Sequence, residues 1–315
     1  MANSKVTVFP VHNVGWPISD AVLPLKTRQS GSERVKGTRV TSTTELGRTV
    51  TANSIETNVL EAGVRGDPVI LIHGSGPGVT AYANWRGVIP VLAENFRIVA
   101  PDMVGFGFTE RPVGIRYGLQ TWVDQVVGLM DSVGLPKAHL VGNSFGGSIA
   151  LRLAARHPDR VDKLVLMGST GVPFDITEGL DAVWGYTPTF ENMRAVMDYF
   201  AYSRELVTDE LAEIRYRAST QPGFQESFGS MFPAPRQRWI DALSTPDDEI
   251  RRLPHRTLVV HGREDRVIPV SNSYRLSEMI PGADLVVFSR CGHWTQIERT
   301  ADFNRLVRDF FVGEQ

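Results

Sequence analysis

The residues most able to do chemistry surround Ser144, which lies at the centre of the segment 142–146 (GNSFG). This segment fits the pattern G-x-S-x-G, with a short apolar run at 140–141 before it and a helix-period segment that stops before Pro158. Such a strand-to-helix turn is so sharp that the positions two residues before and two after the serine cannot carry a Cβ. It lifts the hydroxyl above the sheet edge, at a helix N-terminus, where negative charge is favoured. The pattern indicates a nucleophile elbow; an ordinary packing turn is the alternative.

A serine nucleophile needs a base to take its proton and a carboxylate to orient that base. In this arrangement the chain order is serine, acid, histidine, each on a loop that follows a strand. Asp265 and His293 occur in that order, each directly after a short apolar run. We therefore predict a triad of Ser144, Asp265 and His293, with Glu264 as the competing candidate for the acid.

Other polar residues also follow apolar runs, and we interpret them differently. Asp102 stands on the wrong loop for the triad acid, and structural roles are expected for three histidines: His73, His255 and His261.

Acyl-type chemistry also needs N–H donors aimed at a developing oxyanion. One candidate is the backbone N–H of Phe145, which follows the nucleophile. The second should come from the glycine-containing loop 73–78 (HGSGPG), where Ser75 or Gly76 has the right position. A phosphate-binding role for this loop is disfavoured, because no Gly-Lys-Ser/Thr follows it.

The surrounding pattern predicts an α/β fold that holds these loops at one sheet edge. Residues 49–52 and 55–60 read as a hairpin with its turn at 53–54. Short apolar runs spaced by helical patterns then favour a mostly parallel sheet covered on both faces. The runs are 69–72, 98–100, 140–141, 164–167, 258–260 and 285–288, and the two clearest helical stripes lie within 119–133 and 303–311.

One interval breaks this alternation, because roughly ninety residues between Met167 and Leu258 carry no strand signal, far more than a normal connection. The interval is rich in aromatic residues, and Thr187 with Pro188 predicts a helix start. We interpret 173–250 as a helical lid inserted between two parts of the core, 45–172 and 251–315. Most of its aromatic side chains should form the lid's own core.

Residues 1–44 differ from the rest, being basic and serine-containing with weak periodicity. They predict a flexible tail, while a transit peptide or a misplaced start codon are open alternatives. The tail lacks the apolar centre of a secretory signal, so we expect a cytoplasmic protein.

Composition narrows the classes of partner. The net charge of −2 implies neither a nucleic-acid nor a membrane partner, and no apolar run could span a bilayer. Cys291 is the single cysteine, so an intramolecular disulfide is excluded. No Cys/His cluster has metal-ligand spacing, and neither a metal nor an organic cofactor is expected.

Four segments together resemble the meta-cleavage product hydrolases, which are α/β-hydrolase enzymes of bacterial aromatic-ring degradation. They are 73–78 followed by Asn84-Trp85, then 142–147, 261–269 and 291–294. The resemblance covers about residue 45 to the C-terminus. It implies hydrolysis of a carbon–carbon bond in 2-hydroxy-6-oxo-2,4-dienoates, without cofactor, by a homo-oligomer. The stretches 102–112, 178–188 and 221–238 resemble the branch that acts on products from toluene, cumene or other monoalkylbenzenes.

Carried over by position, the resemblance makes Ser144, Asp265 and His293 the triad and makes Ser75 and Phe145 the oxyanion donors. It also implies substrate-binding residues: Gly76, Asn84, Asn143, Phe200, Arg215 and Trp294. Arg215 has independent support, because within 209–219 it shares a helical stripe with Leu211, Ile214 and Ala218 and should face the apolar side. A substrate carboxylate would suit a charge placed there; an arginine whose stem packs while its head reaches water is the alternative. The resemblance implies an acidic residue where this sequence has Arg217. This position lies on a different face of the helix from Arg215.

The expected mechanism begins with conversion of the dienol to a ketone, bound through Arg215, Asn84 and Asn143. His293 then acts as the base, and Ser144 or a water it positions attacks the C6 carbonyl. A general carboxylesterase with the same triad and a ligand sensor without turnover are the rival interpretations. A dehalogenase or epoxide hydrolase is disfavoured, because those place Asp where Ser144 stands.

Overall fold

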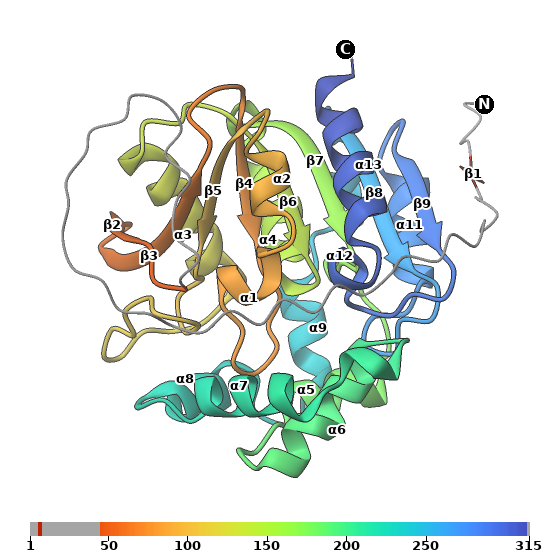
Figure 1. Ribbon diagram of the computed structural model, residues 1–315. Coiled ribbons are helices and arrows are strands. Elements are labelled where there is room, and N and C mark those ends of the chain that lie inside the picture. The colour runs from red at the N-terminus through yellow and green to blue at the C-terminus, as the bar shows by residue number, and fades with distance from the viewer. Residues whose placement is uncertain (1–5, 8–44, 314–315) are drawn as a thin grey trace, which may run out of the picture.

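The computed structural model describes residues 6–7 and 45–313, and its centre is a single nine-stranded sheet (Figure 1). The strand order is β1-β9-β8-β7-β6-β4-β5-β3-β2. The β2–β3 and β3–β5 pairs are antiparallel and all other pairs are parallel, as expected for strands that alternate with helices. The strands are β1 (Val6–Thr7), β2 (Arg48–Ala52), β3 (Ile55–Ala62), β4 (Pro68–Ile72), β5 (Arg97–Pro101), β6 (Ala138–Asn143), β7 (Val161–Met167), β8 (Arg256–Gly262) and β9 (Asp284–Phe288).

Both faces of the sheet are covered, which explains why its central strands are apolar throughout. Successive residues of β4 enter opposite layers: Ile70 and Ile72 join one hydrophobic core, and Val69 and Leu71 join the other. The first core packs against α3 (Leu119–Ser132), α4 (Phe145–Arg156) and α11 (Ser271–Met279). The second packs against α1 (Ala81–Trp85), α2 (Ile89–Leu92) and α13 (Thr300–Val312). The predicted α/β-hydrolase fold is confirmed.

The predicted hairpin also forms, and its turn explains its sequence. Asn53 and Ser54 have φ values of 49° and 63°, a conformation that short polar side chains tolerate. Both predicted helical stripes are likewise buried faces, in α3 and in α13.

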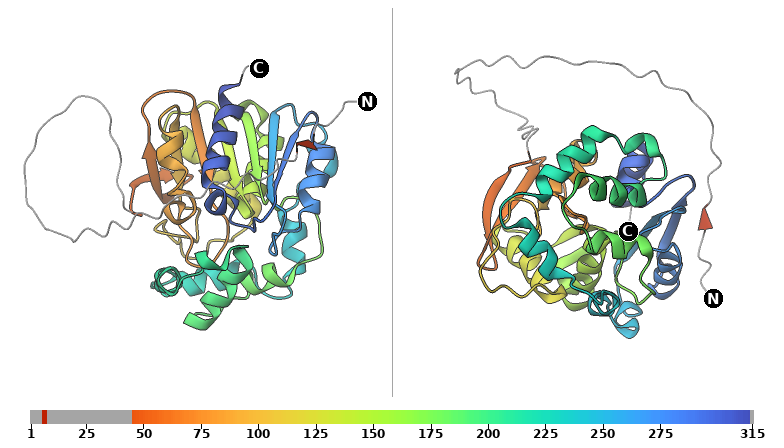
Figure 2. Two further views of the ribbon diagram at one scale, coloured as in Figure 1. Left: turned by 45° about the vertical axis from the view of Figure 1, so that its right-hand side comes forward. Right: turned by 90° about the horizontal axis from the view of Figure 1, so that it is seen from below.

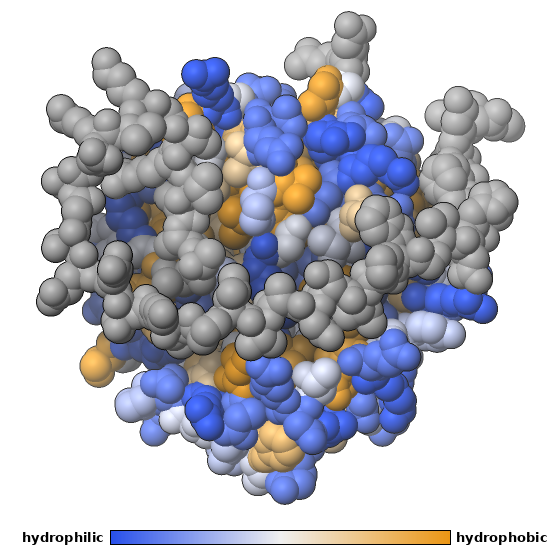
Figure 3. Space-filling model, viewed as in Figure 1, coloured by the Kyte–Doolittle hydropathy of each residue, from blue (hydrophilic) through white to orange (hydrophobic). Residues whose placement is uncertain are grey.

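The chain between β7 and β8 is helical apart from its connections, so this interval contains no strand. Its helices α5 to α8 gather at one end of the sheet (Figures 1 and 2). On the face shown in Figure 3 the lid is largely hydrophilic, with hydrophobic side chains along its border with the sheet domain. The elements are α5 (Glu178–Trp184), α6 (Phe190–Phe200), η2 (Arg204–Leu206), α7 (Asp209–Ser219), α8 (Phe224–Met231), α9 (Gln237–Leu243) and α10 (Asp247–Ile250).

The predicted helix start at Thr187 and Pro188 is wrong by two residues. Thr189 is the N-cap of α6, and its side chain accepts the Asn192 N–H. The Thr187 side chain instead accepts from the Asn192 side-chain amide, so it supports the turn before the helix.

The N-terminal part is described only at β1, where Val6 and Thr7 pair in parallel with Leu285 and Val286 of β9. That pairing was not predicted, because two residues carry no periodicity. The remaining residues of the predicted tail lie outside the described ones, so its flexibility stays a prediction. Among the described residues, no helix has the length and apolarity needed to cross a bilayer.

Candidate active site

Ser144 occupies the turn between β6 and α4 with backbone angles of φ 55° and ψ −117°. A positive φ is rare and strained for a residue with a side chain. The two flanking glycines make the turn possible: a Cβ on Gly142 would lie 2.4 Å from the Gly146 carbonyl oxygen, and one on Gly146 would lie 2.3 Å from that of Ile72. The turn therefore has the geometry expected of a nucleophile elbow, with Ser144 at the N-terminus of α4.

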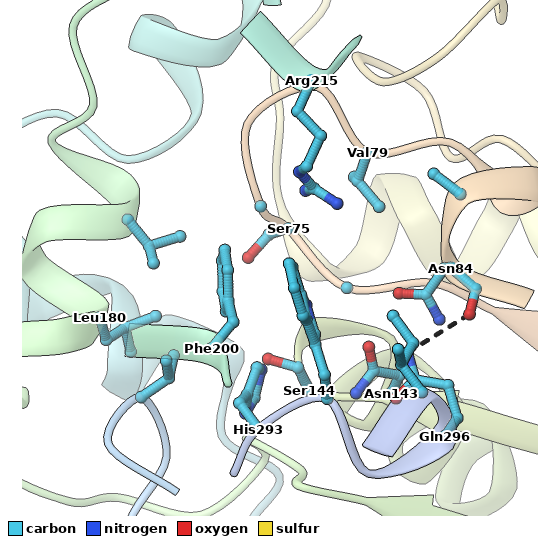
Figure 4. A pocket seen from close by; sticks show the side chains of 17 residues that line it. Ser75, Val79, Asn84, Asn143, Ser144, Leu180, Phe200, Arg215, His293 and Gln296 are labelled. Atoms are coloured by element: carbon cyan, nitrogen blue, oxygen red, sulfur yellow. Dashed lines mark hydrogen bonds between the residues drawn. The ribbon is translucent and has the colours of Figure 1, made fainter. Parts of the chain in front are cut away.

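Asp265 and His293 are hydrogen-bonded to each other. His293 Nδ1 donates to Asp265 Oδ2 over 2.7 Å, and the other carboxylate oxygen accepts the N–H groups of Val267 and Ile268. Burial works to raise the pKa of Asp265, but the nearby His293 and His261 outweigh it and hold the pKa below its usual range. Asp265 is thus a fully ionised acceptor, which fixes the His293 tautomer with Nε2 free to act as a base. Figure 4 shows the Ser144 hydroxyl beside the His293 ring.

Glu264, the competing acid, has a different task. Its Oε2 accepts the N–H of Cys291, and its own N–H donates to the Cys291 carbonyl oxygen. Glu264 therefore joins the Asp265 loop to the His293 loop through the backbone and does not contact the imidazole. Burial raises the pKa of the Cys291 thiol to about 12, so this cysteine stays protonated.

His261 was expected to be structural, yet it contacts Asp265, the predicted triad acid. Its Nε2 lies 3.1 Å from Asp265 Oδ2 and 3.0 Å from the Ile268 carbonyl oxygen, which places the proton on that nitrogen. The opposite ring nitrogen lies 2.6 Å from Ser273 Oγ. His261 therefore contacts the same carboxylate oxygen as His293.

The loop 73–78 lies directly against the elbow. A Cβ on Gly74 would lie 3.1 Å from Asn143 Oδ1 and 3.5 Å from Ser144 Cβ. His73 fixes this loop, because its Nδ1 donates to the Gly74 carbonyl oxygen and its Nε2 accepts the Met103 N–H. Burial lowers the pKa of His73 to about 4, so it is neutral and structural. Ser75 thus lines the same cavity as Ser144, and Phe145 follows Ser144 at the start of α4; their role as oxyanion donors stays a prediction.

Ser75 also has a partner in the lid. Trp184 of α5 donates its indole N–H to Ser75 Oγ over 3.0 Å, and both residues are buried. The lid therefore contacts the oxyanion loop through a directed hydrogen bond as well as through packing.

Asp102 is buried near the site but does not line its cavity. It accepts hydrogen bonds from the Asn58 side chain and from the N–H groups of Ala81 and Phe108. Burial raises its pKa to about 6. Asp102 therefore anchors the start of α1, the helix that carries Asn84. His255, whose Nε2 lies 3.0 Å from the Pro158 carbonyl oxygen, also stays outside the cavity.

Arg215 enters the same cavity from α7 of the lid (Figure 4). Only 6% of the residue is exposed, and its guanidinium lies 5.9 Å from the Phe200 ring centroid and 5.5 Å from that of Trp294. Its Nη2 donates to the Pro77 carbonyl oxygen, whereas Nε has no hydrogen-bond partner in the part of the chain that the structure describes. Burial lowers the pKa of Arg215 to about 10, so it keeps its charge at neutral pH. No described carboxylate lies within ion-pair distance of it.

The prediction that Arg215 faces inward is confirmed, but one member of the predicted stripe, Ile214, is wrong. The buried positions of α7 are Ala212, Arg215 and Ser219, while Ile214 is 51% exposed. Ile214 lies one position from Arg215, about 100° around the helix, and so points away from the cavity. Arg217 is exposed on another face and pairs with Glu213.

The two predicted asparagines complete the polar end of the cavity. Asn84 Nδ2 is buried with no hydrogen-bond partner among residues 6–7 and 45–313, and Asn143 Nδ2 makes a long bond of 3.4 Å to the Met167 carbonyl oxygen. Gly76 belongs to the same wall, because a Cβ there would lie 3.1 Å from Phe200 and 3.2 Å from Arg215. This end therefore presents a buried cation and an unsatisfied amide donor, a combination suited to an anionic ligand with several oxygen atoms.

The opposite wall of the cavity is apolar and was not predicted. Leu180 and Val183 of α5 and Val267 after β8 line it. Leu180 and Val183 are three residues apart in α5, and this spacing predicts that both lie on one face of the helix. It does not distinguish a residue that lines a cavity from one in the core of the lid. The cavity is narrow, with little free space between the side chains that line it. Among the described residues, no cluster of His, Cys, Asp or Glu could hold a metal ion.

Residues 67–300 match the family described as the alpha/beta hydrolase fold, and the chain belongs to that family. It is 60% identical over 270 residues to a 2-hydroxy-6-oxo-2,4-heptadienoate hydrolase of Pseudomonas putida, which covers 86% of this chain and 98% of the relative. It is 59% identical to a 2-hydroxymuconate semialdehyde hydrolase of Pseudomonas sp. strain CF600, covering 85% and 94%. A meta-cleavage product hydrolase from Pseudomonas fluorescens IP01 (CumD) superposes with a TM-score of 0.84 at 61% identity, covering 85% and 98%. Within the α/β hydrolases, the chain is a meta-cleavage product hydrolase.

Proposed function

We propose that this protein hydrolyses the carbon–carbon bond of 2-hydroxy-6-oxo-2,4-dienoates, giving 2-hydroxypenta-2,4-dienoate and a carboxylic acid. The observation that carries this proposal is the buried Arg215 guanidinium, which faces the cavity of Ser144 and forms no ion pair with a described carboxylate, Glu45 acting on it only at longer range. A buried charge without a counter-ion is costly, and a ligand carboxylate would remove that cost. A plain ester would leave it uncompensated.

Arg215, with Asn84 and Asn143, would bind the carboxylate and the C2 oxygen. The positive charge of Arg215 and the N–H donors of all three side chains would favour the 2-keto form. In that form C5 has gained the proton lost by the C2 hydroxyl. This ketonisation makes the later cleavage possible, because the electron pair of the C5–C6 bond can then pass into the conjugated 2-oxo acid.

His293, oriented by Asp265, would take the proton from Ser144 or from a water that Ser144 positions, and the oxygen would attack C6. The N–H groups of Ser75 and Phe145 would hold the resulting oxyanion. Collapse of this intermediate breaks the C5–C6 bond, and water supplies the hydroxyl of the carboxylic acid product. The apolar wall of Leu180, Val183 and Val267 would contact the C6 substituent.

Bleaching of the yellow 2-hydroxy-6-oxo-2,4-heptadienoate by purified protein, with both products identified by NMR, tests the proposal. Hydrolysis of p-nitrophenyl acetate without bleaching would indicate a carboxylesterase. A spectral shift on binding without bleaching would indicate a sensor. Either result would overturn the proposal.

We further propose substrates with a small alkyl group at C6, a homo-oligomeric enzyme and a cytoplasmic location. The 60% identity to a 2-hydroxy-6-oxo-2,4-heptadienoate hydrolase supports the first: a C6 phenyl substrate should give a kcat/KM about five- to hundredfold lower, because overpacking a closed site costs about 1–3 kcal/mol. Light scattering would measure the oligomeric state, and fractionation of expressing cells would test the location.

A further inference from the structure

Glu298 joins the lid to the loop that carries His293. It ends α12 (Thr295–Glu298), and its two carboxylate oxygens accept hydrogen bonds from two separate segments. Oε1 accepts the N–H of Gly292 over 2.7 Å, and Oε2 accepts the N–H groups of Tyr202 and Ser203, each over 3.0 Å. We propose that Glu298 is a positioning residue, a latch that holds the His293 loop and the end of lid helix α6 in one fixed arrangement.

Both latched segments lie against the reacting groups. Gly292 directly precedes His293, and Phe200 ends α6 two residues before Tyr202. The Phe200 ring stacks on His293 with centroids 5.8 Å apart and on Trp294 with centroids 5.1 Å apart. A displacement of either segment would therefore move a ring that packs on the base.

The two backbones also touch directly. Trp294 donates its N–H to the Phe200 carbonyl oxygen over 3.1 Å. A Cβ on Gly292 would lie 2.7 Å from that same oxygen and 2.8 Å from the Tyr202 nitrogen, so the approach requires glycine. The close approach brings the N–H groups of Gly292, Tyr202 and Ser203 near one another. All three donate to the Glu298 carboxylate.

A carboxylate suits this position for a geometric reason. Its two oxygens accept on opposite sides, and charge-assisted bonds to N–H groups are stronger than neutral ones. A glutamine of the same shape has one acceptor oxygen, and its NH₂ group would face an N–H donor on the other side. Glu298 is absent from the cavity wall, so it acts through the two segments and not on the substrate.

The inference rests on the proposed role of His293 as the base, but not on the identity of the substrate. An imidazole displaced by about 1 Å from Ser144 costs up to a hundredfold in rate. Because both ester and dienoate hydrolysis need the base, loss of the latch should slow both reactions.

The test compares Glu298→Gln with the matched control Glu278→Gln, which changes an exposed carboxylate on α11. We expect kcat at 25 °C to fall about ten- to hundredfold on both 2-hydroxy-6-oxo-2,4-heptadienoate and p-nitrophenyl acetate in the first variant only. Hydrogen exchange should accelerate in the peptides around 202–203 and around 292 together. A residue that only stabilises the fold would lower Tm and leave kcat of the folded enzyme unchanged.

Ser203→Pro provides a second variant if Glu298→Gln does not fold. Ser203 has a φ of −82°, which proline accepts, and the change removes one lid-side N–H while Glu298 stays in place. A several-fold loss of kcat on the ester is expected. Unchanged kcat, or exchange that rises in only one segment, overturns the latch. Failure of the wild-type enzyme on the dienoate would refute the proposed function and leave the ester comparison valid.

Discussion

Replacing Arg215 by methionine would remove the buried charge, which lies against the stacked rings of Phe200 and Trp294, and would keep an unbranched side chain in its place. Among the described residues the guanidinium has one hydrogen-bond partner, the Pro77 carbonyl oxygen, and its Nε has none. Arg215→Met should therefore leave Tm unchanged or raise it. The substitution removes the cost of burying a charge and breaks only one hydrogen bond to a described residue. The substitution separates a role in binding from a role in stability.

The expected loss of activity follows from the contact that the substrate would lose. A hydrogen bond to a charged group contributes about 1.5–3 kcal/mol, or roughly a ten- to hundredfold change in kcat/KM at 1.4 kcal/mol per tenfold. The loss should be confined to the dienoate. p-Nitrophenyl acetate has no carboxylate, so its hydrolysis should change less than threefold.

Arg217→Met is the matched control, because the same substitution two residues further along α7 removes an exposed arginine that pairs with Glu213. Steady-state kinetics on both substrates and Tm by differential scanning calorimetry would be measured for all three proteins. Equal losses on both substrates would mean that Arg215 supports only the lid. Wild-type kinetics on both would refute the argument that its charge is reserved for a carboxylate.

Three further outcomes are expected. Ser144→Ala and His293→Ala should each lower kcat on the dienoate by at least about 10⁴-fold, and the double variant should be little worse, because the residues act as a unit; independent, multiplying losses would contradict a shared step. The pKa of Asp265 is depressed in the folded protein, so its stabilisation is present above the unfolded pKa of about 4 and is lost as pH falls through the folded value. The Tm difference between wild type and Asp265→Asn should be constant from about pH 5 to 8 and shrink below about pH 4, and a difference that grows in acid would reverse the sign of this reasoning. Trp184→Phe removes the hydrogen bond to Ser75 Oγ and should lower kcat several-fold on both substrates, whereas Trp239→Phe, which loses a bond to the Pro233 carbonyl oxygen elsewhere in the lid, should not; equal effects would exclude a specific role for the Ser75 contact.

The parts of the fold that were predictable depend on local patterns. The elbow follows from the glycines beside Ser144, since backbone atoms occupy the space that their side chains would need. The strands were predictable from short, continuously apolar runs, because a strand in a sheet covered on both faces is apolar at every position. The order of Asp265 and His293 then follows from the fold class.

Features that depend on tertiary placement were not predictable. Periodicity put Ile214 with Arg215, but the lid turns α7 so that Ala212 and Ser219 are buried and Ile214 is exposed. The contact of His261 with Asp265 joins the end of β8 to its own loop and leaves no pattern in the sequence. The two-residue pairing of β1 with β9 is too short for any periodicity to indicate.

The backbone at Ser144 has a consequence for engineering. A residue with a side chain at φ 55° costs about 1–3 kcal/mol, and glycine would relieve most of that cost. A library selected for thermal stability alone would therefore enrich glycine at the position whose hydroxyl the proposed mechanism requires. Stabilising this scaffold requires a screen in which every round is scored for turnover, because resistance to heat and competence as a catalyst are opposed at this single residue.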